Sequence, residues 1–308
     1  MTREATNCTT ATNYGLEGEI KDAPSVPAVS GPRGVHGPWL ELIPNRHTRI
    51  PRLLLTKTHC KAFCSGTYCG PDKTFHTVRS FMTGCLTGNQ GVLDEKGVLR
   101  LRDTTYDPSI VQKAIHLFRH PLDNIVARFH LEFNEKRDAG DTRYTQIFPK
   151  NATGFHRWCA MDDRNRGLIK SHLMDRKLRS LMMTIPCFNE FYRYGQWHNL
   201  AFATTQAMNV TTMVLHYHEY SQDLATARAK VLQFLEVPRV GEGIQFHDGK
   251  VYRNYYTAAQ RQAIRVFLEE LSITETWKEL QGYDFETNTS PEPGSIDIEL
   301  KKKWMKKQ

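Results

Sequence analysis

The sequence lacks several features that would place it in a specialised class. No segment approaches the roughly 18 consecutive apolar residues of a membrane-spanning helix, so we expect no such span. The first thirty residues do not combine a basic start with an apolar block, which argues against a signal peptide. We therefore expect any targeting segment or membrane anchor to lie upstream of Met1. No internal repeat is present, so a repeat architecture is excluded.

The composition is that of a folded protein with a modest basic excess. Hydrophobic residues make up 40% and charged residues 24% of the 308 positions, which suits one or two folded domains. The net charge is +8, and five lysines of this excess lie in the segment 296–308, which reads as a solvated tail. Elsewhere the basic residues are scattered and no nucleic-acid-binding module is recognised, so we expect no nucleic-acid partner.

The cysteines and sequons favour an oxidising compartment. The seven cysteines are an odd number, and three of them fall within ten residues. Four Asn-x-Ser/Thr sequons begin at Asn7, Asn151, Asn209 and Asn288. We therefore expect a glycoprotein with disulfides, in the Golgi lumen rather than the cytoplasm.

Strand-like and helix-like segments alternate along the chain. Short apolar runs predict strands at 52–57, 114–118 and 211–217. Apolar residues at three- and four-residue spacing predict helices at 121–135, 188–207, 221–236 and 257–271. This alternation predicts an α/β fold, a parallel sheet flanked by helices. We expect an irregular segment at 1–49, the α/β domain at 50–285 and a disordered basic tail at 286–308.

Arg119 occupies the position where an open parallel sheet binds anions. It follows the predicted strand 114–118 and precedes the helix that starts at Pro121. Free backbone N–H groups and the positive end of the helix dipole attract an anion there. A guanidinium adds a bidentate partner for phosphate. The alternative is a surface ion pair between Arg119 and Asp123.

The segment 116–130 resembles the one by which sulfotransferases hold the 3′-phosphate of their donor, 3′-phosphoadenosine-5′-phosphosulfate (PAPS). The family pattern is an apolar strand, Arg-x-Pro-x-Asp, and a serine eight residues after the arginine. Arg119, Pro121 and Asp123 match, but the serine position is Ala127. Arg128, next to it, is the candidate that compensates for the missing hydroxyl.

A second resemblance lies in Pro51–His59, which is similar to the Pro-Arg-apolar-Lys-Thr-His segment of cytosolic sulfotransferases. It implies that His59 removes the acceptor proton and that Lys57 steadies the transferring sulfuryl group. A histidine can activate a hydroxyl in this way, and a cation can balance charge on the equatorial oxygens. We expect both side chains to point to the same side of the strand end.

Two further observations refine the resemblance. The segment 213–220 is similar to the late strand of the family that ends in Tyr-Glu-Asp. The loop that cradles the 5′-phosphosulfate, a strand followed by Pro-x-Ser/Gly-Gly-Thr, is missing from residues 1–50. The stretch 9–15 resembles one that follows this loop in a divergent algal branch. The implied fold is the P-loop-type sulfotransferase fold, N-terminally incomplete.

The predicted function is transfer of a sulfuryl group from PAPS to a hydroxyl or amine, with a glycan as one such acceptor. The alternatives are a catalytically silent relative that binds ligands, and a zinc-stabilised interaction module. The second would use His59, Cys60, Cys64, Cys69 and His76, whose spacing departs from the usual C-x2-C pair, so we expect no metal. His130 and Glu132 rank below His59 as acid–base candidates, and we expect Glu132 to pair with Arg128.

Overall fold

The computed structural model describes residues 9–12, 54–60, 77–93, 95, 99–105, 107–166, 175–239 and 252–286. The strands are β1 (Thr9–Thr12), β2 (Leu54–Lys57), β3 (Thr87–Leu93), β4 (Leu99–Thr105), β5 (Lys113–Phe118) and β6 (Thr211–His216). The α-helices are α2 (Val78–Leu86), α3 (Pro121–Asp138), α4 (Thr142–Ile147), α5 (Ala152–Arg166), α6 (Arg176–Met182), α7 (Phe188–Ala207), α8 (Glu219–Gln222), α9 (Leu224–Leu235), α10 (Ala258–Leu271) and α11 (Thr274–Leu280). Short 3₁₀ helices are η2 (Pro108–Ile110) and η4 (Arg253–Tyr255).

The chain divides into two compact units. Unit 1 comprises Met1–Phe118 and Gln196–Phe246, and unit 2 comprises Arg119–Gly195 and His247–Gln308. Helix α7 contributes its first residues to unit 2 and its last residues to unit 1. Of the predicted domain boundaries, the one after residue 49 lies outside the described residues and the one after residue 285 lies at their C-terminal limit.

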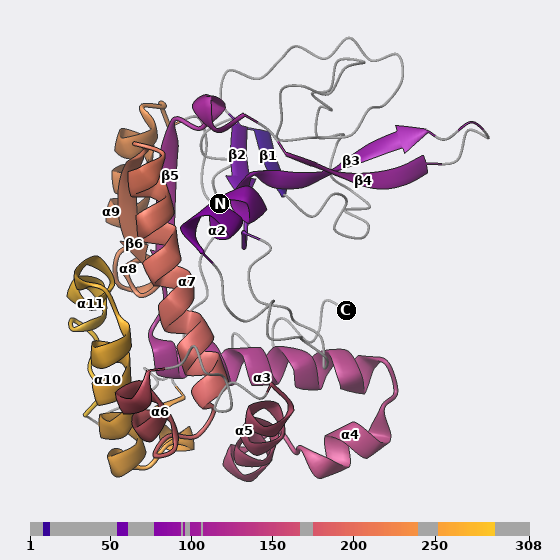
Figure 1. Ribbon diagram of the computed structural model, residues 1–308, viewed down its shortest axis with the longest axis vertical. Helices are drawn as coiled ribbons and strands as arrows, with labels where there is room; N and C mark the ends of the chain where they lie inside the picture. The colour runs from indigo at the N-terminus through magenta and orange to yellow at the C-terminus, as the bar shows by residue number, and fades with distance from the viewer. Residues whose placement is uncertain are drawn as a thin grey trace, which may run out of the picture. The chain divides into compact units, whose positions relative to one another are not determined.

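Unit 1 contains a parallel strand pair with helical residues on both faces. Strands β5 and β6 pair in parallel, with Lys113 opposite Thr211 and Phe118 opposite His216. Because side chains alternate between faces, His116 and Phe118 meet aromatic side chains of α7, while Leu215 packs against α9 (Figure 1). This pair joins two of the three predicted strands, while the third, β2 (Leu54–Lys57), pairs with another strand.

Two further strand pairs belong to unit 1. Strand β1 pairs in parallel with β2, from Thr9 opposite Leu54 to Thr12 opposite Lys57. It is a short strand within the segment that we expected to be irregular. Strands β3 and β4 form an antiparallel hairpin that follows directly on α2.

Unit 2 is helical in its described part. Helix α3 contacts α4 and α5, and α6 contacts α10 (Figure 1). Leu122, Ile125, Val126 and Phe129 are buried along one face of α3, as their spacing predicts. Gly195 allows a close approach of α7 to α10, because a Cβ atom there would lie 2.6 Å from a methyl group of Leu271.

The predicted helices and strands are therefore largely confirmed. The molecule is α-rich, with a parallel two-stranded sheet flanked by helices, and α7 has the predicted bounds. The predicted helix 221–236 is divided, because Asp223 ends α8 and caps α9 through the backbone N–H of Thr226. Among the described helices, none has both the length and the apolarity needed to cross a membrane.

Candidate functional site

Arg119 lies in the two-residue connection between β5 and α3. It is half-buried, and its carbonyl oxygen accepts a hydrogen bond of 2.7 Å from the Tyr194 hydroxyl. Helix α3 begins at Pro121, as predicted. The Asp123 carboxylate accepts the backbone N–H of Tyr252 at 2.8 Å. This carboxylate thus has a main-chain partner, and its pairing with Arg119 stays an alternative prediction.

His120 caps α3 from inside the fold. Its Nδ1 accepts the backbone N–H of Leu122 at 3.2 Å, and its Nε2 donates to the Asp284 carbonyl at 3.0 Å. These two bonds define a neutral imidazole with its proton on Nε2. Burial lowers the pKa of His120 and favours this neutral form. One of the amides that we expected an anion to meet is thus bound by a side chain.

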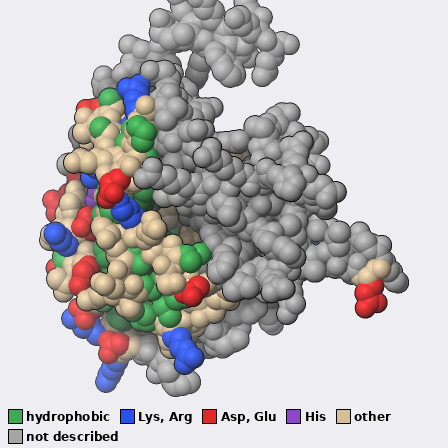
Figure 2. Space-filling model, turned by 90° about the horizontal axis from the view of Figure 1, so that it is seen from above, with side chains coloured by type: hydrophobic (Ala, Val, Ile, Leu, Met, Phe, Trp, Pro, Cys, Tyr) green, Lys and Arg blue, Asp and Glu red, His purple; other side chains and the backbone are tan. Residues whose placement is uncertain are grey.

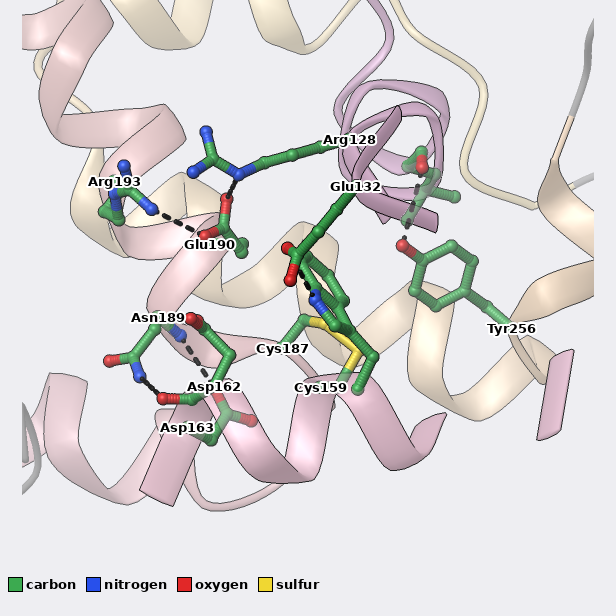
Figure 3. Close-up of a disulfide and its surroundings, with 12 residues drawn as sticks. Arg128, Glu132, Cys159, Asp162, Asp163, Cys187, Asn189, Glu190, Arg193 and Tyr256 are labelled. Atoms are coloured by element: carbon green, nitrogen blue, oxygen red, sulfur yellow. Dashed lines mark hydrogen bonds and ion pairs between the residues drawn. A yellow bond between two sulfur atoms is a disulfide. The ribbon is translucent and has the colours of Figure 1, made fainter. Parts of the chain in front are cut away.

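Arg128 forms an ion pair across helices. Its Nε lies 3.0 Å from Glu190 Oε2, and Nη1 of Arg193 lies 2.6 Å from Glu190 Oε1. Figure 3 shows the two guanidinium groups meeting the two oxygens of this carboxylate. The remaining nitrogens of Arg128 bond to no described residue, so they can donate to an anion.

Glu132 does not pair with Arg128, contrary to the prediction. One carboxylate oxygen accepts from Trp158 Nε1 at 3.0 Å and the other from the Tyr144 hydroxyl at 2.9 Å. Burial, and then the charge of Glu132, raise the pKa of Tyr144 and keep it a donor. Helical spacing predicted the wrong partner because a buried donor, Trp158, and a half-buried donor, Tyr144, from other helices bind this carboxylate.

His130 is held between tyrosines. Its Nδ1 lies 3.2 Å from the Tyr252 hydroxyl and its Nε2 lies 2.9 Å from the Tyr255 hydroxyl. Both rings meet the imidazole edge to face. A neutral imidazole accepts at one nitrogen and donates at the other, so this histidine can pass a proton between two hydroxyls.

A disulfide joins α5 to the start of α7. Cys159 and Cys187 are bonded and fully buried. Beside them, the Asp163 carboxylate accepts the backbone N–H of Asn189 at 3.0 Å, and the Asn189 side chain donates to the Asp162 carbonyl at 2.9 Å (Figure 3). Burial raises the pKa of Asp163 to about 7, against the lowering effect of these amides. Spacing alone did not predict this cap, because Asp163 lies on a different helix from the one it caps.

The predicted catalytic residues lie in unit 1. Strand β2 ends at Lys57, whose side chain lies outside the described ones, so its direction relative to His59 stays a prediction. His59 is exposed, and its carbonyl oxygen accepts from Trp197 Nε1 at 3.1 Å. The next residue, Cys60, is bonded to Cys85 of α2. The His59 carbonyl and the residue that follows it are therefore anchored.

The four predicted site residues fall into two pairs. Lys57 and His59 belong to unit 1, and Arg119 and Arg128 belong to unit 2. The disulfide also bears on the zinc alternative, because a bonded Cys60 has no thiolate to offer a metal. Cys64, Cys69 and His76 lie outside the described residues, and within these no group of three His, Cys, Asp or Glu side chains is arranged to hold a metal ion.

A histidine cluster on the sheet face toward α7 was not predicted. His198 stacks on Phe118 with ring centroids 3.9 Å apart, and His116 meets Phe202 edge to face at 4.8 Å. Burial lowers the pKa of His116 to about 4. Burial, with the nearby His116 and His216, lowers the pKa of His198 to about 3. These rings are neutral aromatic core residues at neutral pH. For His116, the signal in the sequence is its place between the apolar strand residues Ile115 and Leu117.

The described surface carries charges of both signs. Figure 2 shows Lys and Arg side chains interspersed with Asp and Glu side chains, with hydrophobic groups between them. On this face the described basic side chains do not gather in one patch. A phosphate-binding role therefore depends on individual arginines at defined positions.

Comparison of the chain with models of protein families, with curated proteins and with solved structures finds no match.

Proposed function

We propose that this chain is a sulfotransferase that moves a sulfuryl group from PAPS to a hydroxyl or amine acceptor. The proposal includes the P-loop-type sulfotransferase fold, of which the β5–β6 pair between α7 and α9 would be part. The observation that carries it is the connection from β5 to α3. A parallel strand ends at Phe118, a helix begins at Pro121, and Arg119 stands between them. Ligands gather at this end of parallel strands.

The surroundings of Arg119 support a binding role for its side chain. Its carbonyl oxygen accepts a hydrogen bond from the Tyr194 hydroxyl, which fixes the main chain that carries the guanidinium at the start of α3. On this proposal Arg119 holds the 3′-phosphate of the donor. Arg128, further along α3, supplies additional donors, and Glu190 holds its Nε in place.

The chemical step is assigned to the residues of unit 1. On this proposal His59 accepts the proton of the attacking hydroxyl, and the Lys57 ammonium balances charge on the sulfuryl oxygens. The Trp197 bond and the Cys60 disulfide restrict the main chain that carries His59. Such restriction suits a general base, whose contribution depends on its position relative to the acceptor.

Donor binding is tested by calorimetric titration of the full chain with 3′-phosphoadenosine-5′-phosphate. Loss of a charged hydrogen bond costs about 1.5–3 kcal/mol, so we expect Arg119→Ala to weaken binding at least about 10-fold. Arg143→Ala is the matched control, since Arg143 is exposed on α4. Equal affinity of wild type and Arg119→Ala, or no binding by the wild type, overturns the proposal.

Transfer is tested separately from binding. With labelled PAPS and a panel of phenols, alcohols and hexosamines, we expect His59→Ala to lose transfer and to keep nucleotide affinity. Binding of the nucleotide without transfer to any acceptor would favour the catalytically silent relative instead.

A further inference from the structure

The turn between α7 and β6 presents an asparagine in an unusual conformation. Asn209 has a left-handed φ of 52°, and its backbone N–H donates to the Gln206 carbonyl at 3.0 Å. The next amide, of Val210, donates to the Thr205 carbonyl at 2.9 Å. These bonds close the end of α7, and asparagine tolerates this conformation better than most residues. The main chain is therefore satisfied, and the turn is fixed.

The side chains of this turn face solvent. Asn209 and Thr211 are both exposed, and together with Val210 they form the sequon Asn-Val-Thr. The side-chain carboxamide of Asn209 makes no hydrogen bond to the described part of the chain. By contrast, Asn151 of the sequon Asn-Ala-Thr accepts the backbone N–H of Gly154 at 3.0 Å, a helix cap. Of the two described sequon asparagines, Asn151 and Asn209, it is Asn209 whose side chain makes no hydrogen bond to a described residue.

A second observation concerns the compartment. Within the part of the chain that the structure describes, four cysteines are joined in two disulfides, Cys60–Cys85 and Cys159–Cys187. Disulfides persist in oxidising compartments such as the lumen of the secretory pathway and are rare in the cytosol. N-linked glycans are attached in that same lumen to asparagines of accessible sequons.

We propose that Asn209 carries an N-linked glycan. Its Nδ2 bonds to C1 of the first sugar of a lipid-linked oligosaccharide, and the bond from C1 to the diphosphate oxygen breaks. The lipid diphosphate leaves, and Nδ2 loses one proton, with no change of oxidation state. The sugar chain then extends from an exposed turn and displaces no described contact. This modification is independent of sulfuryl transfer.

Peptide mapping tests the proposal on the protein isolated from the cells that produce it. Trypsin releases Asn209 in the peptide 194–228 and Asn151 in the peptide 151–157. Treatment with an N-glycosidase in heavy-oxygen water converts a glycosylated asparagine to an aspartate that carries one heavy oxygen. We expect this mark at Asn209 in most molecules. Recovery of the peptide 194–228 only in its unmodified form overturns the proposal.

Variants of the hydroxyl position separate the modification from the fold. Thr211 is exposed at the first residue of β6, so neither Thr211→Ser nor Thr211→Ala removes a buried contact. Expressed in the same cells, Thr211→Ser should keep the glycan because the sequon remains. Thr211→Ala should lose it and run faster on a gel by one glycan, with an unchanged thermal transition after enzymatic deglycosylation. A glycan retained by Thr211→Ala contradicts the proposal.

Discussion

The carboxyl group of Asp163 on α5, which accepts a backbone amide of α7, is subject to two opposing effects on its pKa. Asp163 accepts the Asn189 amide, which favours its charged form, but burial disfavours the charge more strongly. Its pKa of about 7 lies well above the 3.8 of the unfolded chain. The folded state therefore binds a proton more tightly than the unfolded state between these values. By linkage, this group contributes stability at low pH and loses it as the pH rises toward 7.

We expect the free energy of unfolding to carry this signature. One pKa unit corresponds to about 1.4 kcal/mol, so the Asp163 contribution should fall by about 2 kcal/mol from pH ~5 to pH ~8. Asp163→Asn should remove this fall while keeping an acceptor for Asn189. Urea unfolding at both pH values measures it, with exposed Asp138→Asn as the control. An unchanged pH dependence in Asp163→Asn contradicts the prediction.

Arg261 is a buried cation that is solvated by backbone carbonyl groups. Its guanidinium donates to the carbonyl oxygens of Phe285, Tyr256 and Glu286 at 3.0–3.1 Å, and the residue is only 2% exposed. The planar fork thus fixes the chain after α11 to α10. An ammonium group on a flexible stem cannot reach three carbonyls in this arrangement.

Replacing the Arg261 guanidinium should therefore lower the free energy of unfolding even when the positive charge is kept. We expect Arg261→Lys to destabilise the protein by about 2–4 kcal/mol, because buried carbonyls lose their donors. Arg265→Lys, one turn along α10, alters a partly exposed pair with Glu269 and should cost less than about 0.5 kcal/mol. Denaturant midpoints of the two variants provide the comparison. Equal midpoints would show that the fork is dispensable.

At the scale of elements, a covalent bond decides how α5 and α7 are held. Cys159 and Cys187 are 28 residues apart, and the disulfide closes this loop in the unfolded chain as well. Neither helix is strongly amphipathic along its whole length, and buried polar groups such as Asn189 and Glu190 lie at the start of α7. The disulfide compensates by lowering the entropy of the unfolded state.

Removal of this bond should weaken unit 2. For a loop of this length the chain-entropy estimate is about 3–4 kcal/mol, which we expect for the double variant Cys159→Ala/Cys187→Ala. Alanine avoids placing a hydroxyl in the buried site. Urea unfolding under oxidising conditions measures the loss, and under reducing conditions the wild type should approach the variant. A variant as stable as the oxidised wild type rules the argument out.

At the scale of the whole molecule, the buried histidines and the Asp163 carboxyl respond to pH in opposite directions. In unit 1, His116 and His198 have folded pKa values of about 4 and about 3, below the ordinary 6.5. As the pH falls below 6.5, these histidines become protonated in the unfolded chain but not in the folded one. Their contribution to the free energy of unfolding is therefore lost. His216 and Glu219 also face this cluster, and Lys230 pairs with Glu219. Two histidines outweigh the one carboxyl of Asp163, so acid should destabilise the protein.

His116→Phe isolates the histidine contribution. The variant keeps an aromatic ring against Phe202 and removes the group that titrates. Between pH ~7 and pH ~5 the wild type should lose about 2 kcal/mol more stability than this variant. Thermal unfolding at the two pH values tests this, with His156→Gln on α5 as the control. A wild type and a His116→Phe variant with the same acid sensitivity would refute it.

The sequence by itself determined the strands β2, β5 and β6 and the longer helices α3, α7, α9 and α10, but it did not predict α2, α4, α5, α6, α11 or the β3–β4 hairpin. Local periodicity depends on which residues face a core, so it predicted the bounds of α7, the start of α3 at Pro121 and the strands β5 and β6. It also predicted the buried face of α3. In α10 it was less reliable, since Val266 is exposed although it fits the apolar spacing, while Ile264 is buried. A spacing rule does not say on which side a helix meets its neighbours.

Only the tertiary structure decided the partners of the polar groups. The carboxylate of Glu132 turned to Trp158 and Tyr144, Arg128 bonded to Glu190, and Cys60 bonded to Cys85. For the carboxylates of Glu132 and Glu190 the reason is desolvation, because a carboxylate removed from water needs donors wherever the chain brings them. The distance between two residues along the sequence does not predict such contacts, whereas the periodicity of apolar residues is a local property of each helix and strand.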